Sequence, residues 1–145
     1  MKKVLIALLA ILLCFGTVFC FVACKDDEEE GTTSAKGKID YNISSMSSTM
    51  AYNTTLNILN SPAEYEGETI KIKGSFSQGT ISGGTKNHYF VDVYDSNSCC
   101  STWVTFAWEG DMPPRGTKVT VTGKISAKKE NGNYYPEIQA TSVTY

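Results

Sequence analysis

Two segments of the chain repeat one alternating pattern. Residues 67–77 read GETIKIKGSFS and residues 116–126 read GTKVTVTGKIS, so apolar side chains recur at every second position. Strict alternation predicts a half-buried β-strand, and a glycine inside a strand is typical of a sharp bend. Two long strands that bend at Gly74 and Gly123 suit a small closed barrel, in which no strand edge is left free.

Three further segments complete the predicted sheet. They read HYFVDVYD at residues 88–95, STWVTFAW at 101–108 and NYYPEIQATSVTY at 133–145. Pro136 predicts an edge or a bulge in the last strand, because proline cannot donate a backbone hydrogen bond. The sequence therefore predicts a mainly β fold with a five-stranded barrel.

One short helix is expected ahead of the barrel, at its N-terminal side. Tyr52, Leu56 and Leu59 follow helical spacing. Ser47, Ser48 or Thr49 would cap the start of this helix, and Pro62 would end it.

The N-terminus has the pattern of a bacterial secretion signal. Lys2 and Lys3 precede an uncharged apolar run over residues 4–23. The sequence FVAC at residues 21–24 resembles a lipobox, which implies that Cys24 is lipidated and becomes the first residue after cleavage. The run is also long enough to span a bilayer, so an uncleaved transmembrane anchor is the alternative. Either anchor would hold the domain on the extracytoplasmic face of the cell membrane.

These features predict three segments: a lipoprotein signal peptide (1–23), a lipidated, disordered acidic tether (24–45) and one folded domain (46–145). The tether begins KDDEEEGTTSAKGK, which is too polar to bury a core. Charges of the two signs nearly cancel in the domain, and no basic stripe is present. This composition argues against a nucleic-acid partner, since phosphate neutralisation dominates such binding.

The two remaining cysteines are neighbours. Cys14 and Cys20 would leave with the signal, so the mature chain would keep Cys99 and Cys100 as free thiols. Outside the cytoplasm these two would be able to pair as a disulfide. Such a ring is strained, because adjacent Cα atoms lie closer than in an ordinary disulfide. The alternative interpretation is a buried, apolar Cys100 beside an incidental Cys99.

Catalytic and metal chemistry find little support in the sequence. His88 is the only histidine, and a lone histidine is more often a surface or capping residue than a catalyst. No CxxC spacing is present, and cysteines that continued a strand would point to opposite faces. We therefore expect no catalytic residue, no native metal site and no cofactor.

Four segments carry a resemblance to a known group of proteins: SPAEYEGETIKIKG, YFVDVYD, the CC pair and GTKVTVTGKI. They resemble a group of small, uncharacterised bacterial lipoproteins with an OB-type domain and a vicinal cysteine pair. The resemblance covers residues from about 46 to 145. The domain is similar in turn to the vicinal-cysteine domain of some bacterial membrane proteins linked to permeases. The resemblance implies an OB-like barrel and a surface location, but no activity.

OB barrels commonly bind ligands on the outer face of their second and third strands. Here that face would present Phe90, Asp92, Tyr94 and Trp103. The alternative is that the helix or a long loop covers these aromatic residues. The sequence therefore predicts a non-enzymatic module that binds a small molecule, a glycan or a protein. A thiol-redox or metal-handling protein that uses Cys99 and Cys100 is the alternative.

Overall fold

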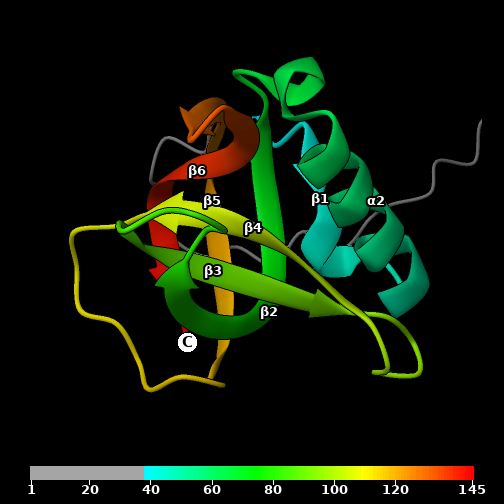
Figure 1. Cartoon of the computed structure of the whole chain (residues 1–145). Helices are drawn as coiled ribbons and strands as arrows, with labels where there is room; N and C mark the ends of the chain where they lie inside the picture. Colours follow the sequence, from blue (N-terminus) through cyan, green and yellow to red (C-terminus); the bar gives the residue numbers. More distant parts are fainter. Residues whose placement is uncertain (1–37) are drawn as a thin grey trace, which may run out of the picture. The chain divides into compact units, whose positions relative to one another are not determined.

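The computed structural model describes residues 38–145. The predicted signal peptide, Cys24 and the tether up to residue 37 lie outside the described residues. The elements, in chain order, are β1 (Tyr41–Asn42), η1 (Ile43–Ser45), α2 (Ser48–Asn60), η2 (Pro62–Tyr65), β2 (Thr69–Thr80), β3 (Asn87–Tyr94), β4 (Ser101–Ala107), β5 (Lys118–Glu130) and β6 (Asn133–Thr144). The fold is mainly β, with its short α-helix ahead of the five long strands (Figure 1).

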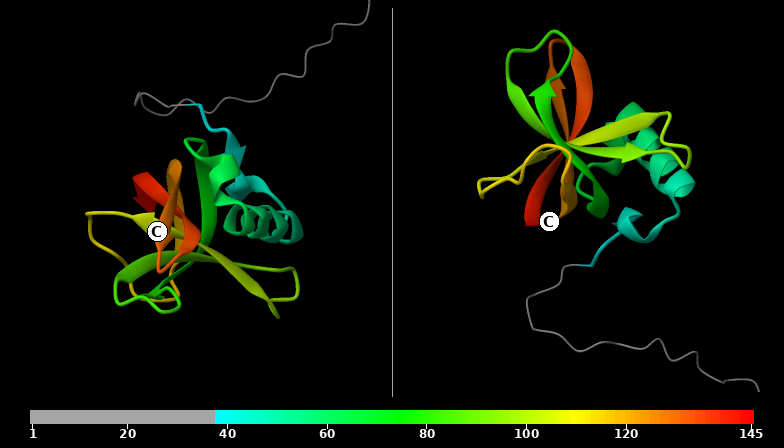
Figure 2. Two further views of the ribbon diagram at one scale, coloured as in Figure 1. Left: turned by 45° about the horizontal axis from the view of Figure 1, so that its top comes forward. Right: turned by 90° about the horizontal axis from the view of Figure 1, so that it is seen from below.

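Strands β2 to β6 form a closed barrel. Their neighbour order is β2-β3-β4-β6-β5, and β5 pairs back onto β2. Strands β4 and β6 run parallel, through residues 105–107 and 137–139, and the other barrel pairs are antiparallel. Two further views show how the strands curve around one another, with α2 to one side (Figure 2). The predicted five-stranded barrel is confirmed, and β1 adds a short parallel strand beside β2.

Gly74 and Gly123 lie where neighbouring strands leave no room for a side chain. At Ser75, strand β2 changes its partner from β5 to β3. A Cβ atom on Gly74 would lie 2.6 Å from Cγ1 of Val91 and would also collide with the carbonyl oxygen of Asp92. A Cβ on Gly123 would lie 2.8 Å from Cα of Ala140. Only glycine fits at either position without a backbone shift.

The barrel interior is filled by the alternating side chains that the sequence predicts. Phe76, Tyr89 and Phe106 pack edge to face or tilted, with ring centroids 5.6–6.3 Å apart. The most buried core side chains are aliphatic: Ile70, Ile72, Val91, Val104, Val119, Val121, Ile125 and Ile138. Burying these side chains supplies most of the hydrophobic stabilisation of the domain.

Helix α2 packs a slightly different stripe against the barrel than predicted. Its N-cap is Ser47, whose side chain accepts a hydrogen bond from the backbone N–H of Met50. The buried residues are Ala51, Thr55 and Ile58, whereas Tyr52, Leu56 and Leu59 are only half-buried. The prediction missed Thr55 because threonine is polar. Its hydroxyl donates to the carbonyl of Ala51 at 2.7 Å, which removes the cost of burial.

One boundary and the position of the irregularity in the last strand differ from the prediction. Residues 41–45 were assigned to the tether, yet they form β1 and η1, and the Ile43 side chain is in the core. In β6, Pro136 lies one residue before the ladder with β4 begins, where β6 pairs with β5 alone. The register shift is elsewhere in β6: Thr122 of β5 pairs with Ser142 and Gly123 pairs with Ala140, so Thr141 is the extra residue.

Candidate functional site

The cysteine pair lies in the loop that joins β3 to β4. A tight turn forms because the Ser98 N–H donates to the Asp95 carbonyl at 3.1 Å. The Asp95 N–H donates to the Cys100 carbonyl at 3.1 Å, which closes the loop. Ser98 adopts a φ of 56°, the left-handed region that L residues rarely occupy. The loop therefore turns back on itself just before the cysteines.

The Asp95 carboxylate organises the loop. Its Oδ1 atom accepts hydrogen bonds from the backbone N–H groups of Cys99 at 3.0 Å and Cys100 at 3.4 Å. Its Oδ2 atom accepts one from the Cys99 thiol at 3.2 Å. The Sγ atoms of the two cysteines are 3.5 Å apart. One carboxylate oxygen is thus fixed by the backbone, while the other faces the sulfurs.

The same contacts shift the proton affinities of the loop. The hydrogen bond to Asp95, followed by the one to Cys100, raises the pKa of the Cys99 thiol to about 11. The hydrogen bond from Cys99 lowers the pKa of Asp95 below its usual value. The thiol therefore stays protonated, and the carboxylate charged, at neutral pH.

Both cysteines are exposed thiols. The interpretation of Cys100 as a buried apolar residue is wrong, because the chain turns before β4 begins instead of extending through it. The predicted Cys99–Cys100 disulfide remains a prediction. Within residues 38–145, Asp95, Cys99 and Cys100 form the group whose ligand atoms gather closely enough for a metal, all within 4.8 Å.

A cleft of about 310 Å³ adjoins this loop. It lies between the loop, the bend of β2 and the first turn of α2, which approach one another at one side of the domain (Figure 1). Its lining combines apolar side chains, several hydroxyls and both charge signs. The lining residues are Ile43, Ser44, Met46, Ser48, Ala51, Lys73, Gly74, Asp92, Val93, Tyr94, Asp95, Ser96, Ser98 and Lys118.

The four residues of the predicted ligand face do not form one surface. Asp92 and Tyr94 line the cleft, and Nζ of Lys118 lies 5.8 Å from the Tyr94 ring centroid. Phe90 is instead 9% exposed and packs edge-on against Trp103, with centroids 5.2 Å apart. Phe90 therefore offers no open aromatic face, and the prediction of a continuous aromatic patch is wrong.

His88 is a buried residue, not a surface or capping one. Its side chain is 2% exposed, and Nε2 lies 2.9 Å from Oε2 of Glu130. Tyr135 packs edge-on against the imidazole at 5.4 Å. No local pattern predicts this pair, because Glu130 is 42 residues away in the sequence. The buried imidazole therefore has a hydrogen-bond partner in Glu130, as buried polar groups usually do.

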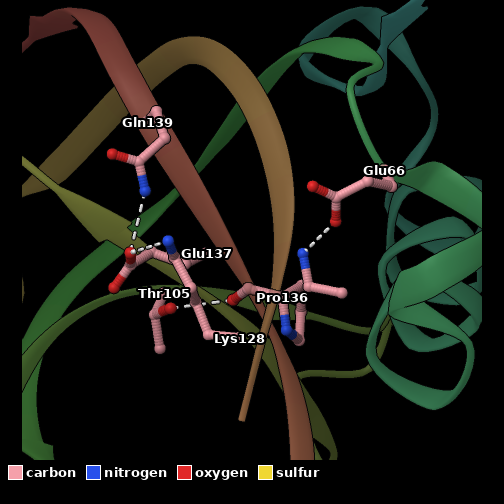
Figure 3. Close-up of polar contacts among 7 residues, drawn as sticks. Glu66, Thr105, Lys128, Pro136, Glu137 and Gln139 are labelled. Carbon is pink, nitrogen blue, oxygen red and sulfur yellow. Dashed lines mark hydrogen bonds and ion pairs between the residues drawn. The ribbon is translucent and has the colours of Figure 1, made fainter.

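A second polar cluster, on strands β4, β5 and β6, was also missed. The Thr105 hydroxyl donates to the Pro136 carbonyl at 2.7 Å, and Gln139 donates to Glu137 at 2.8 Å (Figure 3). Nζ of Lys128 lies 4.0 Å from the Glu137 carboxylate. The Thr105 bond joins β4 to β6 and the Lys128 contact joins β5 to β6, and together these contacts give the buried Thr105 and Glu137 polar partners.

Comparisons with known proteins assign no family to the chain. The chain matches no protein-family model and no curated protein. None of the helices in residues 38–145 is both long and apolar enough to cross a lipid bilayer.

Proposed function

We propose that this chain is a lipid-anchored, extracytoplasmic binding module with an OB-like barrel and no catalytic activity of its own. The strand order supports the OB-like assignment. The first barrel strand, β2, pairs with the second and fourth, and the third pairs in parallel with the fifth. This is the connectivity of a five-stranded OB barrel. The resemblance to OB-type bacterial lipoproteins points the same way.

The anchor is proposed from the sequence alone. The uncharged run over residues 4–23 and the FVAC motif favour lipidation at Cys24. An acidic segment follows and would separate the domain from the lipid surface. The near balance of charges in the domain argues against a nucleic-acid ligand.

The cleft beside the β3–β4 loop is the observation that carries the binding function. Its volume of about 310 Å³ is at the small end of ligand sites. Lys73 and Lys118 bring positive charge to its lining, and Asp92 and Asp95 bring negative charge. Tyr94 is 40% exposed and adds an aromatic edge. Such a lining fits a small ligand that carries both charges, such as an amino acid or a dipeptide.

Ligand-detected NMR on the full-length chain in detergent would test this function. The probes are dipeptides, with neutral monosaccharides as the comparison. We expect saturation transfer to a dipeptide that Tyr94→Ala reduces several-fold. Tyr134→Ala is the matched control, because Tyr134 is an exposed tyrosine that also carries a lysine over its ring, with Lys129 Nζ at 5.2 Å. Saturation transfer to the monosaccharides alone would change the proposed ligand class to a glycan. An equal loss of transfer in Tyr94→Ala and Tyr134→Ala would refute the cleft as the binding site.

The alternative function, thiol-redox or metal handling, also has a specific observation in its favour. Asp95, Cys99 and Cys100 lie together on an exposed loop that shares Asp95 with the cleft.

A further inference from the structure

We propose that Asp95, Cys99 and Cys100 form a three-ligand site for a divalent thiophilic cation of the zinc and cadmium class. This inference does not depend on the ligand cleft, since it uses two sulfurs that do not line that cleft. It differs from the expectation of no metal site, which assumed that neighbouring cysteines point to opposite sides of a strand. They do not, because both lie in the turn before β4.

The distances between the donor atoms are close to those of a chelate. The two Sγ atoms are 3.5 Å apart, and the Cys99 Sγ is 3.2 Å from Oδ2 of Asp95. A tetrahedral zinc ion with sulfur at about 2.3 Å and oxygen at about 2.1 Å needs ~3.8 Å and ~3.6 Å for these pairs. The third pair, Cys100 Sγ and the Asp95 carboxylate, lies within 4.8 Å. Side-chain movements of about 1 Å or less would therefore admit the ion.

The carboxylate is already oriented for ligation. Oδ1 is held by the backbone N–H groups of Cys99 and Cys100, so Oδ2 is presented to the sulfurs. Hydrogen bonds of this kind, which fix a ligand from behind, strengthen metal sites in general. The left-handed Ser98 turns the chain so that the cysteines return over Asp95. The loop thus places three donors from a segment of six residues without help from another strand.

The donor set selects the class of metal. Two thiolates favour zinc, cadmium and other thiophilic ions over magnesium or calcium, which prefer oxygen ligands. On binding, the two S–H bonds break, two sulfur–metal bonds form, and two protons leave to solvent. Three protein ligands leave a fourth position, and the exposed loop opens that position to solvent.

Metal titration of a chain with no other thiol would test the site. The full-length chain would carry Cys14→Ser, Cys20→Ser and Cys24→Ser, and would be kept reduced in detergent. Cobalt and cadmium report sulfur ligation through charge-transfer absorption, and competition with a chelating indicator measures zinc affinity. We expect one ion per chain and loss of the absorption when Cys99 and Cys100 are both changed to serine.

Asp95→Asn separates the three-ligand site from a simple dithiol. Asparagine keeps an oxygen for the two backbone N–H groups but removes the second carboxylate oxygen. We expect zinc affinity to fall on the order of tenfold or more, while Asp111→Asn, an exposed carboxylate in the β4–β5 connection, leaves it unchanged. The proposal is overturned if no charge-transfer band forms, if Asp95→Asn binds like the parent, or if one ion is shared by two chains. Circular dichroism would establish that each variant is folded.

Discussion

Ile72 of β2 lies directly opposite Val121 of β5 in the antiparallel ladder that closes the barrel. These are equivalent positions of the repeated sequence pattern, so the two copies pair with each other in opposite directions. As a result, Gly74 faces Val119 and Gly123 faces Ile70. Gly74 lies where β2 passes from β5 to β3, and Gly123 lies at the register shift of the β5–β6 ladder.

The first prediction concerns those corners. Gly74→Ala and Gly123→Ala should each destabilise the domain by about 1–3 kcal/mol, because the added methyl group collides with a neighbouring backbone. Gly79→Ala is the matched control in β2, since its Cβ would meet only Phe90 Cε2, at 3.9 Å. Urea unfolding measures all three. If the three variants had the same free energy of unfolding within experimental error, glycine would not be required at positions 74 and 123.

The reactivity of Cys99 should depend on pH in a specific direction. Its pKa is raised to about 11 by the hydrogen bond to Asp95, so the thiol is protonated at neutral pH and becomes a thiolate only in strong alkali. In reduced, metal-free chain, alkylation of Cys99 should be slow at pH 7 and should accelerate up to about pH 11. Asp95→Asn should make Cys99 react faster at neutral pH. Peptide mass mapping distinguishes Cys99 from Cys100, and an unchanged Cys99 rate in this variant would refute the assignment.

Oxidation of the metal-free chain should join Cys99 to Cys100. The sulfurs are 3.5 Å apart and must approach to about 2.05 Å. The tight ring makes the product easy to reduce. Intact mass should be two hydrogens lower than that of the reduced chain, and neither cysteine should alkylate until a mild dithiol is added. Immediate alkylation of both thiols in native, air-exposed protein would show that the ring does not form.

Tyr135 should make the barrel sensitive to alkali. Burial, and then the charges of Glu137 and Glu130, raise the pKa of its phenol above 10. The folded state therefore disfavours the phenolate, so the contribution of this group is complete below pH 10 and is lost as the pH rises through the folded pKa. Tyr135→Phe should flatten the fall in unfolding free energy above pH 10. The exposed Tyr134→Phe is the control, and a parallel fall in both variants would contradict the prediction.

Lipidation should require Cys24. Because the FVAC motif ends at this residue, Cys24→Ala should leave an unprocessed, unlabelled precursor. Metabolic labelling with a fatty-acid analogue, followed by gel analysis, measures both properties. Cys20→Ala is the matched control and should label like the parent. Equal labelling of the Cys24 variant would exclude the lipoprotein hypothesis.

The sequence predicted the parts of the fold that depend on local periodicity. Alternation set the five strands, and Ser47 and Pro62 marked the limits of the helix region. It missed the contacts that depend on strands meeting in space. His88 and Glu130 pair only because the β5–β6 hairpin reaches the start of β3.

The candidate site was only partly predicted, because some of its contacts also form only in the folded chain. The turn before β4 follows from its polar residues, and the two thiols follow from the cysteine count. The role of Asp95 was missed because its carboxylate acts through backbone amides four and five residues later, a geometry that appears only once Ser98 has turned the chain. The predicted aromatic face failed because alternation says which way Phe90 points but not that Trp103 covers it.

The parallel ladder between β4 and β6 consists of three residue pairs, whereas the β5–β6 ladder extends along almost the whole of both strands. The barrel therefore has a seam, and local opening should begin there and not at the long hairpins. When β4 and β6 separate, the barrel becomes an open, curled sheet whose other strand pairs remain intact. Amide exchange should therefore be fastest for those amides of residues 105–107 and 137–139 that donate between β4 and β6, while the amides that pair with β3 or β5 stay protected.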